Sequence, residues 1–365
     1  MRRCLVALAT AGVVTGIAGA PAAAAANGWE DVPDPATATW VDDYLPVDGD
    51  TAFARGGIYY GGDPGGGEVS SYWLYEGKTR TQLPKPADQP DSSIWAATSD
   101  KDFWVVGNNY DHSSQVSHWN GSVWQKRNPA DRTATFHDVQ AVSADNVWAV
   151  GTTTQAGATA LPATVGHWNG SAWKIAKLPQ PAGGRTTLTS VHVNSATDIW
   201  AAGQTCTDVK GTNCLGYVTR YDGSAWKQVA LPAGIRALSE ITGHGTDEIW
   251  AAGGTAVLRW NGTTWSRADV TAPGAVSVTE LTWVNGKLHA GLVVEGYNGS
   301  SGIVKWNGRS WDQVPNPIDD PGYVSYINVF RLTGAPDGTL WASAHYTEFW
   351  SNSQYSVKLP PLTAV

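Results

Sequence analysis

One nine-residue pattern recurs along almost the whole chain and constrains its fold more than any other feature. Five copies share an aromatic residue, then Asn-Gly or Asp-Gly, then a tryptophan: HWNGSVWQK, HWNGSAWKI, RYDGSAWKQ, RWNGTTWSR and KWNGRSWDQ. Two degenerate copies, LYEGKTRTQ from Leu74 and FWSNSQYSV from Phe349, bring the number to seven. Units that repeat at a fixed spacing bury their apolar surface against neighbouring copies, so we expect an array of similar units.

A second pattern precedes each of these copies. Five examples are KDFWVVG, DNVWAVG, TDIWAAG, DEIWAAG and DGTLWAS, whose tryptophans are Trp104, Trp148, Trp200, Trp250 and Trp341. Two divergent examples place Phe53 and Leu288 where the others have tryptophan. A short apolar alternation lies upstream of each, as in LTSVHV. The unit therefore contains four short strands, here called a to d, in about 48 residues, which is within the range of propeller blades.

The composition favours strands over helices. The chain has 20 prolines and 41 glycines, and its apolar runs are short and rich in β-branched and aromatic residues. No long segment keeps the 3.6-residue apolar period of a helix. We therefore predict an all-β fold, a seven-bladed β-propeller of four-stranded antiparallel blades, formed by residues 27–365 as a single domain.

The Asn-Gly pairs are predicted to be turns rather than glycan acceptors. Asn-Gly is a strong signal for a two-residue type I′ hairpin, so Asn169–Gly170 is expected to join strand c to strand d. Asp222–Gly223 and Glu76–Gly77 occupy the same place in other units. Asp and Glu cannot carry an N-linked glycan, so glycosylation is not what this position requires. The tryptophans that flank these turns recur regularly, so we expect them to pack between blades rather than to form a stacking platform for sugars.

The N-terminus predicts export. Arg2 and Arg3 precede an apolar stretch that ends in PAAAAA, which is typical of a secretory signal peptide over residues 1–26. A retained anchor is the less favoured alternative. In an exported chain Cys206 and Cys214 are expected to form a disulfide. The net charge of −8 and the lack of a basic run argue against nucleic acid and anionic membranes as partners.

One segment fits two schemes. GWEDVPDP, from Gly28, is similar to SWDQVPNP, from Ser310, which is assigned to a d strand. The early segment could pair with the last blade and close the ring, either displacing or extending YSVKLP. It could also pack elsewhere.

The loops favour one face of the ring as the binding face. The a–b turns are tight, whereas the b–c loops and several d–a connections are long and unlike one another. Long loops on a rigid scaffold commonly carry binding residues. The candidate ligand-binding residues in these loops are Tyr110, Tyr297, Asp319, Asp320 and Tyr323. Calcium at Asp319–Asp320 is a lesser possibility, and we expect no cofactor and no metal.

The histidines give no catalytic pattern. His118 and His167 precede the strand-c tryptophan, but Arg220, Arg259 and Lys305 fill that slot in other units. We therefore expect the slot to be an exposed rim position with a basic preference. The chain also has no G-x-S-x-G elbow and no H-E-x-x-H motif.

The D-x-W-A-x-G element followed by W-N-G-x-x-W resembles the repeat of secreted bacterial β-propellers, akin to the kelch/galactose-oxidase-like and two-component-regulator-type propellers. The resemblance covers nearly the whole chain after residue 26 and implies architecture, but no catalytic residue of these families is carried over. We predict a monomeric, exported, non-catalytic module that binds an extracellular glycan or protein at the long-loop face. The alternative is a polysaccharide lyase or glycosidase that uses acids and tyrosines of the axial funnel. A scaffold without a small ligand is a third possibility.

Overall fold

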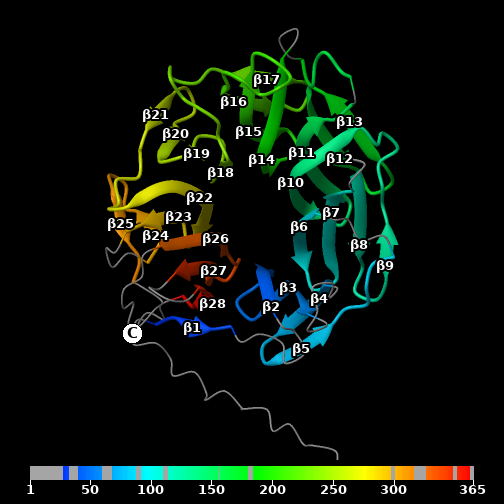
Figure 1. Cartoon of the computed structure of the whole chain (residues 1–365), viewed down its shortest axis with the longest axis vertical. Helices are drawn as coiled ribbons and strands as arrows, with labels where there is room; N and C mark the ends of the chain where they lie inside the picture. The colour runs from blue at the N-terminus through cyan, green and yellow to red at the C-terminus, as the bar shows by residue number, and fades with distance from the viewer. Residues whose placement is uncertain are drawn as a thin grey trace, which may run out of the picture.

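The computed structural model describes residues 28–32, 40–59, 68–87, 92–109, 114–155, 157–179, 184–296, 301–315, 326–347 and 352–361. These residues form 28 strands, and the described part of the chain contains no helix. No segment of it qualifies as a membrane-spanning helix. The sheets are arranged in a ring around a central axis (Figure 1). The predicted all-β architecture is confirmed.

The strands form five four-stranded sheets and one eight-stranded sheet. We divide the eight-stranded sheet into two groups of four and number the resulting groups blades 1 to 7. Blade 1 contains β2 (Trp40–Pro46), β3 (Thr51–Tyr59), β4 (Glu68–Glu76) and β5 (Thr79–Gln82). Blade 2 contains β6 (Ser92–Ser99), β7 (Asp102–Asn108), β8 (Ser114–Trp119) and β9 (Trp124–Lys126). Blade 3 contains β10 (Ala134–Ser143), β11 (Asn146–Thr153), β12 (Ala163–Trp168) and β13 (Trp173–Lys177). Blade 4 contains β14 (Arg185–Ser195), β15 (Asp198–Cys206), β16 (Leu215–Tyr221) and β17 (Trp226–Val229).

The remaining blades follow the same antiparallel order. Blade 5 contains β18 (Glu240–Gly243), β19 (Ile249–Gly253), β20 (Ala256–Trp260) and β21 (Trp265–Arg267). Blade 6 contains β22 (Ala275–Val284), β23 (Lys287–Glu295), β24 (Ile303–Trp306) and β25 (Trp311–Gln313). Blade 7 contains β26 (Tyr326–Gly334), β27 (Leu340–Thr347), β28 (Asn352–Leu359) and β1 (Glu30–Asp31). Blades 6 and 7 are joined into one eight-stranded sheet by pairing between β23 and β26.

Strand β1 closes the ring as the outermost strand of blade 7. Glu30 and Asp31 pair antiparallel with β28, and the amide of Val32 donates to the carbonyl of Ser356 at 2.9 Å. Trp29 is buried, and its Nε1 donates to the carbonyl of Pro315 at 2.9 Å. The early segment therefore extends the last blade, which is one of the two schemes that the sequence allowed.

This closure corrects one assignment made from the repeat. The degenerate copy from Phe349 was expected to be a c–d hairpin, but residues 352–359 form the single strand β28. The d strand of blade 7 comes instead from the other end of the chain. Trp29 takes the place of the d-strand tryptophan in blade 7. Its Nε1 donates to a backbone carbonyl of the preceding blade, as Trp311 Nε1 does in blade 6, where it donates to the carbonyl of Ala268 at 2.7 Å.

The core lies between blades, as the regular recurrence of tryptophan predicts. The strand-b residues Trp104, Trp200 and Trp250 are fully buried. Each contacts the aromatic pair of the next blade; the Trp200 ring centroid, for example, lies 5.6 Å from that of Trp260 and 6.0 Å from that of Trp265. Such rings each bury a large apolar area, so they hold neighbouring sheets together.

The slot that holds His118 and His167 is not an exposed rim position. His118 is 7% exposed and stacks on Trp104, with ring centroids 4.2 Å apart. Asp102 Oδ1 accepts a hydrogen bond from Trp104 Nε1 and shares another with His118 Nε2, both 2.8 Å long. The prediction was wrong because the slot lies directly opposite the strand-b tryptophan in the sheet register.

The same three-residue arrangement recurs with different bases. In blade 4, Asp198 Oδ1 accepts from Trp200 Nε1 at 3.0 Å and from Arg220 Nε at 2.6 Å. The Arg220 guanidinium lies 5.0 Å from the Trp200 ring centroid. Because histidine and arginine substitute for one another here, the arrangement is a packing element and not a catalytic dyad.

The Asn-Gly segments are turns, but not of the predicted type. Trp168 pairs with Trp173, so four residues connect the strands, and only Gly170 among them has positive φ, at 86°. Asn169 Oδ1 accepts from the amides of Ser171 and Ala172 at 3.1 and 3.0 Å. The asparagine therefore acts through its side-chain oxygen rather than through a left-handed backbone. A carboxylate can do the same, which explains why aspartate replaces asparagine in blade 4.

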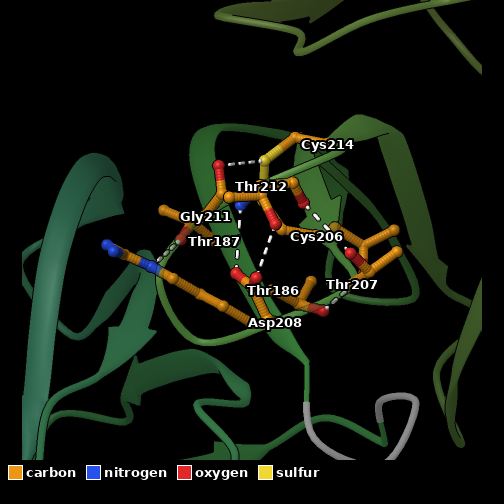
Figure 2. Close-up of a disulfide and its surroundings, with 10 residues drawn as sticks. Thr186, Thr187, Cys206, Thr207, Asp208, Gly211, Thr212 and Cys214 are labelled. Carbon is orange, nitrogen blue, oxygen red and sulfur yellow. Dashed lines mark hydrogen bonds between the residues drawn. A yellow bond between two sulfur atoms is a disulfide. The ribbon is translucent and has the colours of Figure 1, made fainter.

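The predicted disulfide is present. Cys206 and Cys214 are bonded across the connection between β15 and β16, on the b–c side of blade 4 (Figure 2). Inside this loop the amide of Thr212 donates to Asp208 Oδ1 at 3.1 Å. The cross-link and the turn together order the loop.

Candidate functional site

The innermost strands of the blades surround the axis (Figure 1). Several contain a β-bulge at a matching place, for example between Phe136 and Asp138 in β10 and between Val329 and Arg331 in β26. A bulge redirects the side chains next to it. Each innermost strand has one residue that follows the bulge or occupies the matching position. From blade 1 to blade 7 these residues are Asp43, Ile94, Asp138, Ser190, Glu240, Glu280 and Arg331.

Most of these residues line a cavity of about 530 Å³, here called the channel cavity. Residues from all seven innermost strands contribute to it. It also includes Val47 and Pro336, which lie in a–b turns. The channel cavity therefore extends from the middle of the ring toward the face with tight turns.

Several polar side chains of the channel satisfy backbone amides of the next blade. Asp138 Oδ2 accepts from the amide of Val191 at 2.7 Å, and Ser190 Oγ accepts from the amide of Ile241 at 3.1 Å. Thr282 Oγ1 accepts from the amide of Gly334 at 2.9 Å. The inner edge of each sheet would otherwise carry unpaired amides, so these contacts tie adjacent blades together.

The seam between blades 7 and 1 is held by an ion pair. Arg331 Nη2 donates to Asp43 Oδ2 at 2.6 Å, and Arg331 Nε donates to Asp43 Oδ1 at 3.0 Å. Arg331 Nη1 also lies 3.7 Å from Glu280 Oε1. A bidentate pair of this kind fixes the guanidinium in orientation, so Glu280 receives only a weaker, longer contact.

The channel holds more carboxyl groups than cations, and their pKa values reflect this. Burial raises the pKa of Glu280 to about 7, and Arg331 offsets only part of the shift. Burial raises the pKa of Asp138 to about 6, against the hydrogen bonds from backbone amides. Burial, with Glu280 and Asp138 nearby, also raises the pKa of Glu240 well above its usual value.

Arg331 responds in the opposite sense. Burial alone would lower the pKa of its guanidinium, but Asp43 and Glu280 raise it above the ordinary value. The channel therefore combines a permanent cation with carboxyls that can carry a proton near neutral pH. Groups of this kind can donate or accept protons. The described residues contain no group of three or more side chains that could hold a metal ion.

A second cavity lies at the opposite end of the ring. It has a volume of about 650 Å³ and is here called the loop-end cavity; its lining residues include Thr189, Gln204, Ser239, Ser277, Thr279, Asn328 and Phe330. Gln204 and Gly254 stand near the ends of strands b, where the b–c connections begin. The b–c connection of blade 5 has only two residues between β19 and β20, which leaves this region open.

The site residues predicted from the sequence cannot be assigned to either cavity. Tyr110, Tyr297, Asp319, Asp320 and Tyr323 all lie outside the described residues. The proposed signal peptide, residues 1–26, lies outside them as well.

The sequence reasoning missed the channel residues Asp138, Glu240, Glu280 and Arg331. A signal for them exists in the a strands, where FHDVQ, LSEIT, VTELT and VFRLT each place a charged residue two positions after one apolar residue and directly before another. The signal is weak because the residue type differs from blade to blade. Only the position repeats.

A closed ring of four-stranded antiparallel sheets around an axial channel defines a β-propeller. Solved propellers are similar to this chain. The β-propeller domain of the Trilobed protease from Pyrococcus furiosus has a TM-score of 0.52 and 8% identity, over 86% of this chain and 97% of that one. The extracellular domain of a putative hybrid two-component system from B. thetaiotaomicron has a TM-score of 0.57 and 12% identity, over 93% of this chain and 40% of that one.

A chain in the structure of the mitotic checkpoint complex is similar to the same degree, with a TM-score of 0.56, 13% identity and coverage of 96% and 100%. At such low identities these similarities show the fold alone. No protein-family model matches the sequence, and no curated protein matches it. The kelch-like or two-component-regulator type therefore stays a prediction.

Proposed function

We propose that this chain is an exported, non-catalytic β-propeller module that binds an extracellular glycan or protein at the end of the ring that carries the b–c loops. The observation that supports it is the loop-end cavity, which is open and has no ionisable side chain among the described residues that line it. A cavity without an acid or a base can hold a ligand but has no group for proton transfer.

Export is supported by two further observations. Cys206 and Cys214 form a disulfide, which is typical of oxidising compartments. One of the similar solved structures is an extracellular domain. The signal-like segment over residues 1–26 is consistent with both.

The test is binding without turnover. The exported chain is applied to an array of plant, microbial and animal glycans and to immobilised extracellular proteins, and each bound glycan is then incubated with the protein and assayed for new reducing ends. We expect saturable binding and no cleavage. A chain that binds neither class of ligand would contradict the proposal.

A second candidate function is glycan hydrolysis in the channel cavity. It is favoured by the pKa of Glu280, which burial raises to about 7, since a general acid needs a proton near neutral pH. Release of reducing ends that is lost in both Glu240→Gln and Glu280→Gln, with glycan binding retained, would establish this function instead. Activity unaffected by both substitutions would exclude these two residues.

A further inference from the structure

Bulge-position residues from four consecutive blades meet in the loop-end cavity. Thr189 and Thr279 are the extra residues of bulges in β14 and β22, and Phe330 is the extra residue in β26. Ser239 holds the corresponding sequence position immediately before β18. At these positions one residue lines the loop-end cavity and the next residue along the chain lines the channel cavity, where Glu240, Glu280 and Arg331 lie.

The hydroxyls at these positions are oriented by the fold. Thr189 Oγ1 donates to the carbonyl of Leu238 at 2.8 Å, and Thr279 Oγ1 donates to the carbonyl of Val329. Each hydroxyl hydrogen is thereby used, so the oxygen atoms can only accept further hydrogen bonds. The cavity thus offers acceptors in fixed positions.

Other side chains in the cavity have unused hydrogen-bonding capacity. Gln204, Ser277 and Asn328 are partly exposed, and their side chains make no hydrogen bond with any described residue. The two amides supply both donors and acceptors, and the serine hydroxyl supplies one donor and an oxygen that accepts. Phe330 adds an apolar ring from the neighbouring blade.

This set of groups selects against charge. A charged ligand would lose hydration on entering the cavity and would meet no opposite charge among the lining residues that the structure describes. An uncharged ligand with many hydroxyls would instead exchange hydrogen bonds with water for hydrogen bonds with amides and hydroxyls, and its C–H face could pack on Phe330. The volume of about 650 Å³ is typical of small-ligand cavities.

We propose that the loop-end cavity binds an uncharged saccharide, with Gln204, Ser277 and Asn328 as hydrogen-bonding residues and Phe330 as the apolar surface. This inference rests on the proposed function and narrows it to one class of ligand and one location. It also assigns a role to the bulges of blades 4, 6 and 7 and to the matching position in blade 5. They direct one row of side chains toward the ligand and the next row toward the channel.

The test compares neutral and anionic oligosaccharides as probes. Cello-, malto-, xylo-, manno- and chito-oligosaccharides are titrated by calorimetry beside oligogalacturonate and heparin fragments. We expect binding only to members of the neutral group. Phe330→Ala and Asn328→Asp should each weaken it by about tenfold, because the first removes the apolar contact and the second introduces an uncompensated charge.

The control variant is Thr242→Ala, which changes the channel cavity and should leave the affinity unchanged. Thermal melting of each variant verifies that it is folded. Neutral-saccharide binding that both cavity substitutions leave intact would overturn the inference while the proposed function stands. Binding of only anionic glycans or of protein would have the same consequence. Failure of every glycan and protein probe would overturn both.

Discussion

The outer three strands of each blade and the innermost strand follow different rules. In most blades strands b and c repeat the same chemistry: a buried tryptophan, an acid or amide two residues before it and a base stacked on its ring, as in Asp102, Trp104 and His118. Several of the innermost strands share a bulge, but no single residue type occupies the position beside it throughout. At the matching position they carry aspartate, isoleucine, serine, glutamate or arginine.

The difference follows from what each strand contacts. A side chain on an outer strand must fit between two sheets, and the neighbouring blade presents the same surface each time, so one solution serves in most blades. A side chain at the channel faces an open volume, where many residue types are tolerated. Residues whose chemistry differs between blades therefore lie near the axis. The repeated residues of the outer strands serve the stability of the fold.

The largest effect is expected when a repeated tryptophan is removed. Trp200 is fully buried between blades 4 and 5, so Trp200→Ala should lower the free energy of unfolding by about 4 kcal/mol. Urea denaturation measures this. Val123→Ala, at a side chain that is 55% exposed, is the matched control and should change it by less than about 0.5 kcal/mol. Equal effects would contradict the assignment of the core to the space between blades.

A smaller loss is expected when the acid that joins the tryptophan and the base is removed. Asp198→Ala leaves Trp200 Nε1 and Arg220 without their shared acceptor and should cost about 2 kcal/mol of unfolding free energy. The double variant Asp198→Asn with Arg220→His copies the pair that blade 3 uses, in which His167 Nε2 lies 2.9 Å from Asn146 Oδ1. It should recover most of that loss in urea denaturation. No recovery would show that the blades are not interchangeable.

The channel should make stability depend on pH. The folded-state pKa of Glu280 is about 7, above its ordinary value of 4.5, so its favourable contribution is complete in acid and is lost as the pH rises toward and through 7. Glu280→Gln should therefore raise the free energy of unfolding by about 2 kcal/mol at pH 8 and change it little at pH 4. Denaturation curves at several pH values test this. The exposed Glu295→Gln is the control, and an unchanged pH slope in Glu280→Gln would contradict the expectation.

The smallest effect is expected at a surface turn. Asn169→Ala removes the oxygen that accepts two backbone amides and should cost about 1 kcal/mol. Asn169→Asp keeps that acceptor and should be nearly neutral, since Asp222 does the same in blade 4. Thermal melting distinguishes the two. A loss as large in Asn169→Asp as in Asn169→Ala would show that the side-chain amide nitrogen matters.

The sequence predicts those features that recur and misses those that do not. The regular positions of Trp and Asn-Gly were sufficient to predict the sheet architecture and the packing of Trp104. The Cys206–Cys214 bond was predicted from the expectation that the chain is exported. The buried state of His118 was missed because it depends on which residue lies opposite in the neighbouring strand. The convergence of Glu240 and Glu280 depends on ring closure, which brings together strands that share no local pattern.

The pairing of β1 with β28 has a consequence for how the chain reaches its final state. Glu30 and Lys358 are partners although more than three hundred residues separate them, so this contact forms only after nearly the entire polypeptide has emerged. Because a chain is synthesised from its N-terminus, Trp29 has to wait for these late residues before it can be buried. We expect folding to end with this pairing, which is a slow step because the contact joins residues far apart in the sequence. If it failed, the ring would stay open and the edge of β28 would be unpaired.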